Sequence, residues 1–263
     1  MNPQWRARVG LLLLALLSFA SAPSISLAQP SATEVVAKLD AIKSELSQAL
    51  TMQLSTNIVR GSYTTVWRQF EDLAITALKE TLPRHVAGLS ATNFSAGQVG
   101  REKNRLADFA IVCGTNTIEV SIKAARAGEN PENDLGTFRD HPNREKLFVA
   151  AFTVWVRYED HGETLQAQQV FFDRTWRFVG KSTLVDGVKY RKKDGNMRPK
   201  PWAMFDSGKA YWRSEEEFEL AVKRSETYRA NELVKEYLTD LSEDDQKLLH
   251  ERLHDKFAQP LKP

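Results

Sequence analysis

The sequence predicts an α/β domain in which a mixed β-sheet is flanked by helices and followed by a C-terminal helical subdomain. Segments with helical spacing of apolar residues come first and last in the chain, and short β-type runs lie between them. The composition suits a folded domain, because 42% of the 263 residues are hydrophobic and 27% are charged. A single cysteine excludes a disulfide scaffold, and 36 basic against 34 acidic residues give a net charge that points to no class of partner.

The first 28 residues differ from the rest and predict a secretory signal peptide. Arg6 and Arg8 precede the apolar run Leu11–Ala20, and residues 26–28 have the small-x-small pattern of a cleavage site. The run is shorter than the roughly 20 residues of a membrane-spanning helix. We therefore expect a periplasmic or secreted protein that has no membrane association after signal removal.

The position of the start codon leaves an alternative open. A true start at Met52 would remove the signal and the first predicted helix, and the protein would then be cytoplasmic. Met52 still precedes the second predicted helix, so we expect such a shorter chain to keep its core.

Two helices are expected before the first strong strand. Val35 and Leu39 belong to a set of apolar residues at helical spacing within residues 31–50. A second helix is predicted over residues 63–82, and Pro83 is expected to end it.

The hydrophobic period then changes from helical to alternating. Two short runs, residues 107–113 and 117–125, surround a Gly-Thr-Asn turn and predict an antiparallel hairpin. Residues 147–158 and 164–172 are apolar enough to be central strands. Residues 86–100 are expected to form a loop, with a short edge strand as the alternative.

After a polar, basic loop, three further segments return to helical spacing. They are residues 214–224, 226–240 and 243–257. Ser214 and Ser242 stand where helix caps are expected. The chain therefore divides into a signal peptide (1–28), a globular domain (29–212) and a C-terminal helical segment (213–263).

Polar side chains gather on one face of the predicted hairpin. Glu119, Ser121 and Lys123 are spaced by two along the second strand and share a face, whereas apolar residues alternate with them. If residues 115–116 form the turn, Asp108 pairs with Lys123 across the two strands. That register predicts an acid and a lysine side by side at the end of the hairpin.

This arrangement resembles the PD-(D/E)xK core of type II restriction endonucleases. In that family an acid on one strand is followed, after a hairpin, by acid-x-Lys on the next strand, and a preceding helix carries a glutamate. Here Asp108 precedes Ser121-Ile-Lys123, and Glu71 lies in the second predicted helix. The resemblance covers roughly residues 62–212 and implies a restriction-endonuclease-like fold for the globular domain.

The resemblance implies roles for the residues that match it. Asp108 would be a metal ligand, and Lys123 would orient or activate the attacking water. Ser121 stands where the family has its second acid, which is a departure from the family pattern. Glu119, about 6.5 Å along the same strand face, and Glu71 are the candidates for the second carboxylate.

Phosphodiester hydrolysis explains why these residue types would meet. A divalent ion lowers the pKa of a bound water, and Mg²⁺ prefers carboxylate and carbonyl oxygens, so Mg²⁺ is the expected cofactor. The backbone carbonyl of Ile122 is expected to complete the ligand set. The ammonium of Lys123 would stabilise negative charge during an in-line displacement. The resemblance implies products with 5′-phosphate and 3′-hydroxyl ends.

A basic segment provides the expected contact with DNA. Residues 173–200 contain nine basic and three acidic residues, and Tyr190 and Trp202 add aromatic rings. The runs 130–137 and 190–202 also resemble segments of restriction enzymes. The residues expected to contact DNA are Arg126, Asn130, Asn133, Arg191, Lys192, Lys193, Arg198 and Lys200.

Together these features predict a Mg²⁺-dependent, type II site-specific deoxyribonuclease, a restriction enzyme that cuts duplex DNA as a homodimer. The alternative is an exported, non-catalytic protein that holds a polyanion or a protein partner on a nuclease-like sheet, and the missing acid at Ser121 favours it. An ordinary ion pair between strands is the commonplace interpretation of Asp108 and Lys123. A solvated loop is the corresponding interpretation of the basic segment.

Overall fold

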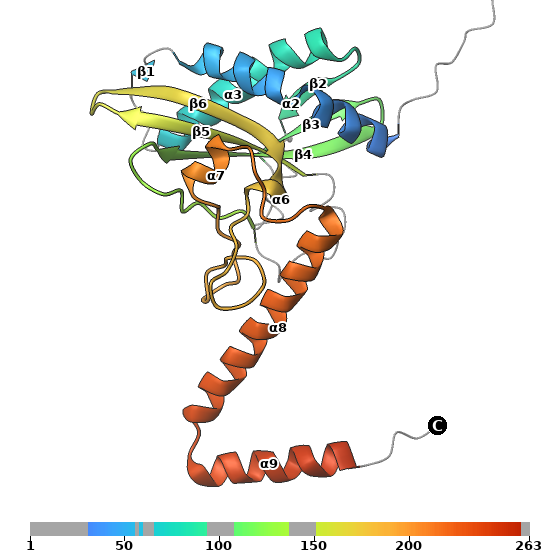
Figure 1. Ribbon diagram of the computed structural model, residues 1–263, viewed down its shortest axis with the longest axis vertical. Helices are drawn as coiled ribbons and strands as arrows, with labels where there is room; N and C mark the ends of the chain where they lie inside the picture. The colour runs from blue at the N-terminus through green and yellow to red at the C-terminus, as the bar shows by residue number, and fades with distance from the viewer. Residues whose placement is uncertain (1–30, 56–57, 60–65, 94–107, 137–150, 259–263) are drawn as a thin grey trace, which may run out of the picture. The chain divides into compact units, whose positions relative to one another are not determined.

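The computed structural model describes most of the chain, namely residues 31–55, 58–59, 66–93, 108–136 and 151–258 (Figure 1). The predicted signal peptide lies outside these described residues. Within them, no helix is both long enough and apolar enough to cross a membrane.

Six strands of the described residues form a mixed sheet in the order β1-β6-β5-β4-β3-β2 (Figure 1). Neighbouring strands are antiparallel except β4 and β5, which are parallel. The predicted α/β class and mixed sheet are thereby confirmed, and the alternative of an edge strand within residues 86–100 is realised as β2. The strands are β1 (Ile58–Val59), β2 (Ser90–Asn93), β3 (Phe109–Cys113), β4 (Asn116–Arg126), β5 (Phe152–Asp160) and β6 (Thr164–Arg174).

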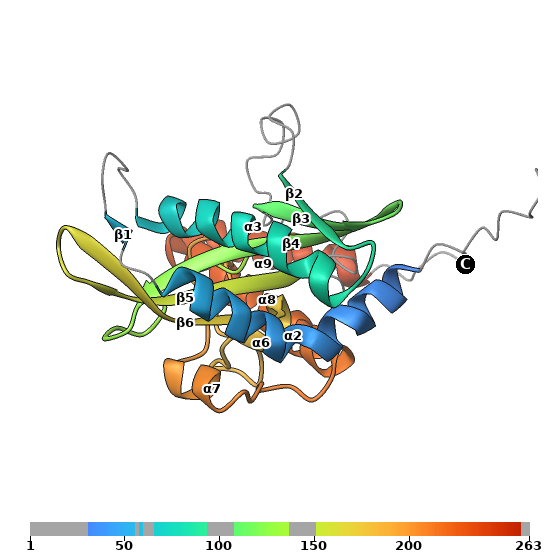
Figure 2. The same ribbon diagram turned by 90° about the horizontal axis from the view of Figure 1, so that it is seen from above.

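Helices α2 (Ala32–Leu54) and α3 (Val66–His85) cover one face of the sheet (Figure 2). A capping box starts α2: the Ser31 hydroxyl accepts from the N–H of Glu34 at 3.3 Å, and the Glu34 carboxylate accepts from the N–H of Ser31 at 2.6 Å. Both helices bury an apolar stripe against strands β3 to β6, so the main core lies between the helices and this face.

Pro83 does not end α3, as the sequence had suggested, because the helix continues to His85. A proline removes one backbone N–H and crowds the preceding turn, but in the last turn of a helix few hydrogen bonds are affected. Leu82 and Leu89 on either side of this turn are 0% and 1% exposed. Their burial in the core holds the turn in place despite the proline.

A chain that began at Met52 would lose most of α2 and would not keep this core. Leu39, Leu46 and Leu50 of α2 have no exposed surface. They pack in the same cluster as Phe172 of β6, so removing α2 would uncover that face of the sheet. The expectation that the core survives such a truncation is therefore wrong.

The β3–β4 hairpin turns at residues 114–115 and not at the predicted residues 115–116. Gly114 has a φ of 59°, in the left-handed region that tight hairpin turns require and that glycine adopts without a steric penalty. The observed pairing of Phe109 with Val120 is shifted by two residues from the predicted register. Because side chains alternate with a period of two, this shift changes the partners but keeps every side chain on its predicted face.

The opposite face of the sheet carries a second apolar cluster around Trp155 of β5. Trp155 has no exposed surface, and its ring lies 6.1 Å from that of Trp202 and 5.3 Å from that of Phe205, edge to face. The short helices α6 (Thr175–Phe178) and α7 (Trp202–Asp206) supply much of this cluster. The sheet is therefore covered on both faces.

The described part of the C-terminal segment contains two helices, α8 (Glu215–Thr239) and α9 (Glu243–Ala258), where three were expected. Ser214 and Ser242 cap them as predicted, each hydroxyl accepting the N–H three residues further on. The first two predicted segments form one continuous helix. Ser225, which lies between them, is fully buried and donates to a carbonyl of the loop over residues 179–201.

Gly187 allows the same loop to approach α8 closely. A Cβ atom at position 187 would lie 2.2 Å from the Oγ of Ser225 and 2.8 Å from the carbonyl oxygen of Ala221. No side chain fits in that space, so the position requires glycine.

We predict that Gly187→Ala lowers the free energy of unfolding by about 1–3 kcal/mol, because the added methyl group overlaps the backbone of α8. Gly128→Ala is the matched control, since nothing lies within 4 Å of a Cβ atom there. The control is expected to change the free energy of unfolding by about 0.5 kcal/mol or less. Urea denaturation followed by tryptophan fluorescence measures both, and equal effects would contradict the close approach.

Lys200 is buried within the second apolar cluster. Its residue exposure is 3%, and its ammonium lies 5.1 Å from the ring centroid of Phe205 and 5.5 Å from that of Phe178. The ammonium donates to the carbonyl oxygen of Lys209 at 2.6 Å. Burial lowers the pKa of Lys200 to about 8, because the apolar surroundings disfavour the charged form.

The lowered pKa of Lys200 predicts that its contribution to the free energy of unfolding increases with pH above about pH 8. Between about pH 8 and the pKa of about 10.4 of a lysine in an unfolded chain, the unfolded state binds more protons, so the free energy of unfolding rises. Lys200→Met removes this contribution. The free energy of unfolding of the variant minus that of the wild type is therefore expected to fall from pH 8 to pH 10 in denaturation series. Lys209→Met, at an exposed position, should give a constant difference, and a constant difference for Lys200→Met would contradict the assignment.

Candidate active site

Asp108 lies directly before β3, and its carboxylate faces β4. The backbone N–H of Asp108 donates to the carbonyl oxygen of Val120 at 2.9 Å. Its Oδ2 accepts from the N–H of Ile122 at 2.6 Å and from the hydroxyl of Ser121 at 3.2 Å. The Nζ of Lys123 lies 4.0 Å from the same oxygen. The acid and the lysine therefore lie close together, as predicted, although they are not direct cross-strand partners.

Both charged side chains are partly open to solvent. The exposed fraction is 25% for the side chain of Asp108 and 20% for that of Lys123. A pair at such positions typically stabilises a protein by about 1 kcal/mol or less. The contact is therefore worth little to the fold, and both groups remain within reach of a ligand.

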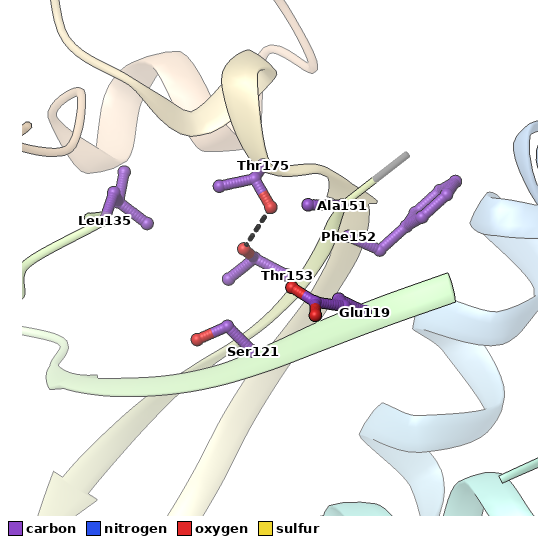
Figure 3. A pocket seen from close by; sticks show the side chains of 7 residues that line it. All are labelled: Glu119, Ser121, Leu135, Ala151, Phe152, Thr153 and Thr175. Atoms are coloured by element: carbon purple, nitrogen blue, oxygen red, sulfur yellow. Dashed lines mark hydrogen bonds between the residues drawn. The ribbon is translucent and has the colours of Figure 1, made fainter. Parts of the chain in front are cut away.

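The polar face of β4 continues into a small pocket beside this pair (Figure 3). Glu119 and Ser121 line it together with Thr153 of β5 and Thr175 of α6, whose hydroxyl oxygens are 2.9 Å apart. The pocket encloses about 10 Å³, close to the space that one water molecule occupies. Leu135, Ala151 and Phe152 complete its lining, and it is too small for a substrate.

Thr153 and Thr175 were not found by sequence reasoning. Ser121 and Thr153 are neighbours only because β4 and β5 pair in parallel. The register of a parallel pair depends on the long connection between its strands, so no local sequence signal reveals it.

Of the two proposed second carboxylates, Glu119 lies on the face that Ser121 and Lys123 share. Glu71 belongs to α3, and its side chain lies outside the described residues. Helix α3 packs through Phe70 on the opposite face of the sheet. The fold therefore favours Glu119 over Glu71.

The oxygen donors near Asp108 fit Mg²⁺ only in part. Within the described residues, no group of three or more Asp, Glu, His or Cys side chains is arranged to hold a metal ion. The carbonyl of Ile122 points to the same side of β4 as its N–H, which reaches Asp108. A carboxylate and a carbonyl are suitable ligands for Mg²⁺, and Glu119 is the described residue placed to extend the set.

Of the predicted DNA-contacting residues at the end of β4 and after it, Arg126 and Asn133 make hydrogen bonds within the protein. Arg126 donates to Asp160 at 2.5 Å, which raises the pKa of the guanidinium. Asn133 donates to the carbonyl oxygen of Ala124 at 3.2 Å. Asn130 is exposed and lines a groove between the loop over residues 179–201 and α8.

The two arginines of the basic loop are held by acidic residues. Arg191 donates to Asp134 at 2.9 Å and also to Asp194, and these hydrogen bonds raise the pKa of its guanidinium. The same contact lowers the pKa of Asp194. Arg198 lies 2.9 Å from Asp134. Asp134, from a distant part of the chain, and Asp194, from the loop itself, therefore offset part of the positive charge of this loop.

The three lysines of the predicted DNA-contacting set differ in accessibility. Lys192 forms an ion pair with Glu236 of α8, and both side chains are more than half exposed. Lys193 is exposed. Lys200, buried in the aromatic cluster, is not available to a phosphate group.

Comparisons with known proteins identify no family. No family model matches the chain, and no curated protein matches it. Among solved structures, it is similar to the NlaIV restriction endonuclease with 13% sequence identity and a TM-score of 0.43, over 74% of this chain and 78% of that chain. A TM-score below 0.5 does not establish a shared fold, so the fold class follows from the observed sheet and helices alone.

Proposed function

We propose that this domain is a Mg²⁺-dependent nuclease that hydrolyses phosphodiester bonds in DNA. The observation that supports it best is that Ser121 and Lys123 of β4 both contact Asp108, the residue directly before β3. This is the placement that the resemblance to the PD-(D/E)xK core implies for the ligand acid, the second motif position and the lysine.

The proposed chemistry assigns each side chain a task. Asp108, the carbonyl of Ile122 and Glu119 would hold Mg²⁺, which supplies charge neutralisation and a more acidic water when bound. The ammonium of Lys123 would orient the attacking water and stabilise the negative charge that develops on the phosphate. The hydroxyl of Ser121 keeps Oδ2 of Asp108 fixed beside β4.

The finer proposal is a type II restriction enzyme that acts on duplex DNA as a homodimer and leaves 5′-phosphate ends. It follows from the resemblance and from the need to cut two strands. An exported protein would meet DNA outside the cytoplasm, and the predicted signal peptide makes a periplasmic or secreted location part of the proposal.

A non-catalytic binding protein on the same fold is the second candidate. The observation that favours it is the position of Ser121, where the family has an acid. One carboxylate oxygen of Asp108 already accepts two hydrogen bonds from β4, which suits a structural residue. The two candidates differ in whether the purified protein cleaves DNA.

We predict that Lys123→Ala lowers plasmid cleavage in Mg²⁺ by about 100-fold or more, because the charge on the phosphate loses its partner. Binding of the same DNA in a gel-shift assay should persist. Lys79→Ala, at an exposed position of α3 on the other side of the sheet, is the control and should cleave like the wild type. Absence of Mg²⁺-dependent, EDTA-sensitive cleavage by the wild type would refute the nuclease proposal and favour the binding protein.

A second prediction concerns the missing acid. Ser121→Asp places a carboxylate beside Asp108 in a position that is only 5% exposed, so repulsion should lower the melting temperature without metal. Mg²⁺ should then raise the melting temperature more in this variant than in the wild type, because the ion binds the folded state.

Ser121→Asn has nearly the same shape as Ser121→Asp without the charge and is the matched control. Calorimetry with and without Mg²⁺ measures all three proteins. An equal effect of Mg²⁺ on their melting temperatures would show that position 121 does not face a metal site.

A further inference from the structure

A groove of about 460 Å³ opens between the loop over residues 179–201 and α8, apart from the proposed catalytic residues. Three exposed lysines and three tyrosines line it, against one glutamate, and the buried Lys200 borders it as well. Its volume is within the range of roughly 300–1,000 Å³ that is usual for small-molecule sites. The side chains that bear on its chemistry are Lys181, Lys189, Lys192, Tyr190, Tyr228 and Glu232.

The walls of the groove are preformed, although the loop has little regular secondary structure. Antiparallel bridges join Val179 to Pro199 and Tyr190 to Met197 within the loop. Arg229 of α8, only 5% exposed, donates to the carbonyl oxygens of two successive loop residues, 192 and 193, at 2.8 and 3.1 Å. A ligand would therefore not have to order the loop, which reduces the entropy cost of binding.

The accessible charge in the groove is positive and exchangeable. Lys189 is exposed. Lys181 pairs with Asp186 at 2.9 Å, and the two side chains are 48% and 70% exposed. Lys192 has a similar pair with Glu236. Pairs this exposed are worth about 1 kcal/mol or less, so a phosphate group can replace these partners at low cost.

The tyrosines provide the second part of a recognition surface. Tyr190, from the loop, and Tyr228, from α8, are both half-buried and line the groove from its two sides. Burial raises the pKa of Tyr190, so its hydroxyl stays protonated and neutral. Aromatic rings beside ammonium groups are the surfaces on which proteins stack nucleobases while holding phosphates.

We infer that this groove binds a nucleotide unit, with its base against the tyrosines and its phosphate among the lysines. The unit would be a free nucleotide or part of a single strand. The inference is independent of the proposed nuclease centre, because neither Asp108 nor Lys123 lines the groove. The groove shares Asn130, Lys192 and the buried Lys200 with the set predicted from sequence to contact DNA. The inference concerns a single nucleotide in a groove and not a duplex.

The test uses titration calorimetry with thymidine 5′-monophosphate, thymidine and inorganic phosphate, and fluorescence anisotropy with a labelled short oligothymidylate. The nucleotide should bind at least about 10-fold more tightly than thymidine or phosphate alone, because two kinds of contact then act together. Tighter binding of the oligomer than of the monomer identifies a single strand. A plot of the logarithm of the association constant against the logarithm of the salt concentration should then have a slope of about −2, because each of about three neutralised phosphates contributes about −0.7. Equal binding of oligomer and monomer identifies a free nucleotide, and either result supports the inference.

Variants with matched controls assign the binding to the groove. Lys189→Glu should weaken binding about 10-fold or more, whereas Lys223→Glu, an exposed lysine of α8 that does not line the groove, should not. Tyr228→Ala should weaken binding about 5-fold or more, and Tyr237→Ala, which is 64% exposed on the same helix, should not. Tyr228→Phe keeps the ring and should bind like the wild type, which keeps the test valid if Tyr228→Ala unfolds.

The inference is overturned if the wild type binds no nucleotide at millimolar concentration, or if phosphate alone binds as tightly as the nucleotide. It is also overturned if the control variants weaken binding as much as the groove variants. The two proposals fail separately. Lys189→Glu should weaken nucleotide binding whether or not the wild type cleaves DNA, and a wild type that cleaves DNA but binds no nucleotide overturns this inference alone.

Discussion

The parallel pairing of β4 with β5 is the constraint on which the rest of the structure depends. Two parallel strands that follow each other in the chain need a long crossover, and both of their faces must be covered. Val154, Trp155 and Val156 are consecutive in β5, and none has exposed surface, although they point alternately to opposite faces. Helices α2 and α3 cover one face, and α6, α7 and the start of α8 cover the other.

The candidate site lies where the pairing of β3 with β4 stops. The first residue of β3, Phe109, pairs with Val120, so β3 does not reach Ile122 of β4. The N–H of Ile122 donates to the carboxylate of Asp108 instead of to a strand. One oxygen of the Asp108 carboxylate thus accepts the backbone N–H of Ile122 and also lies 4.0 Å from the ammonium of Lys123. This explains why a structural and a catalytic interpretation of Asp108 share the same contacts.

The positive charge that the sequence concentrates in the basic segment is partly neutralised in the folded protein by acidic residues from elsewhere in the chain. The basic segment has a strong local excess of positive charge, but Asp134 and Glu236 reach it from other parts of the chain. Burial in the aromatic cluster leaves Lys200 only 3% exposed. Of the exposed lysines, Lys181, Lys189 and Lys192 lie at the groove beside α8, where tyrosines accompany them, whereas Lys193 lies outside it. A binding function for this segment is therefore more specific than its overall charge suggests.

Local sequence patterns were sufficient to predict the positions of α2, α3 and α9, the presence of the hairpin, both serine caps and the shared face of Glu119, Ser121 and Lys123. These features depend on neighbours within a few residues or on the period of two along a strand, which a register shift of two leaves unchanged.

The rest was decided only by the tertiary structure: the continuation of α3 past Pro83, the dependence of the core on α2, the neighbourhood of Ser121 and Thr153, the burial of Lys200 and the groove against α8. Each depends on residues far apart in the chain, whose approach is set by packing and by the closure of long connections. No local pattern records such contacts.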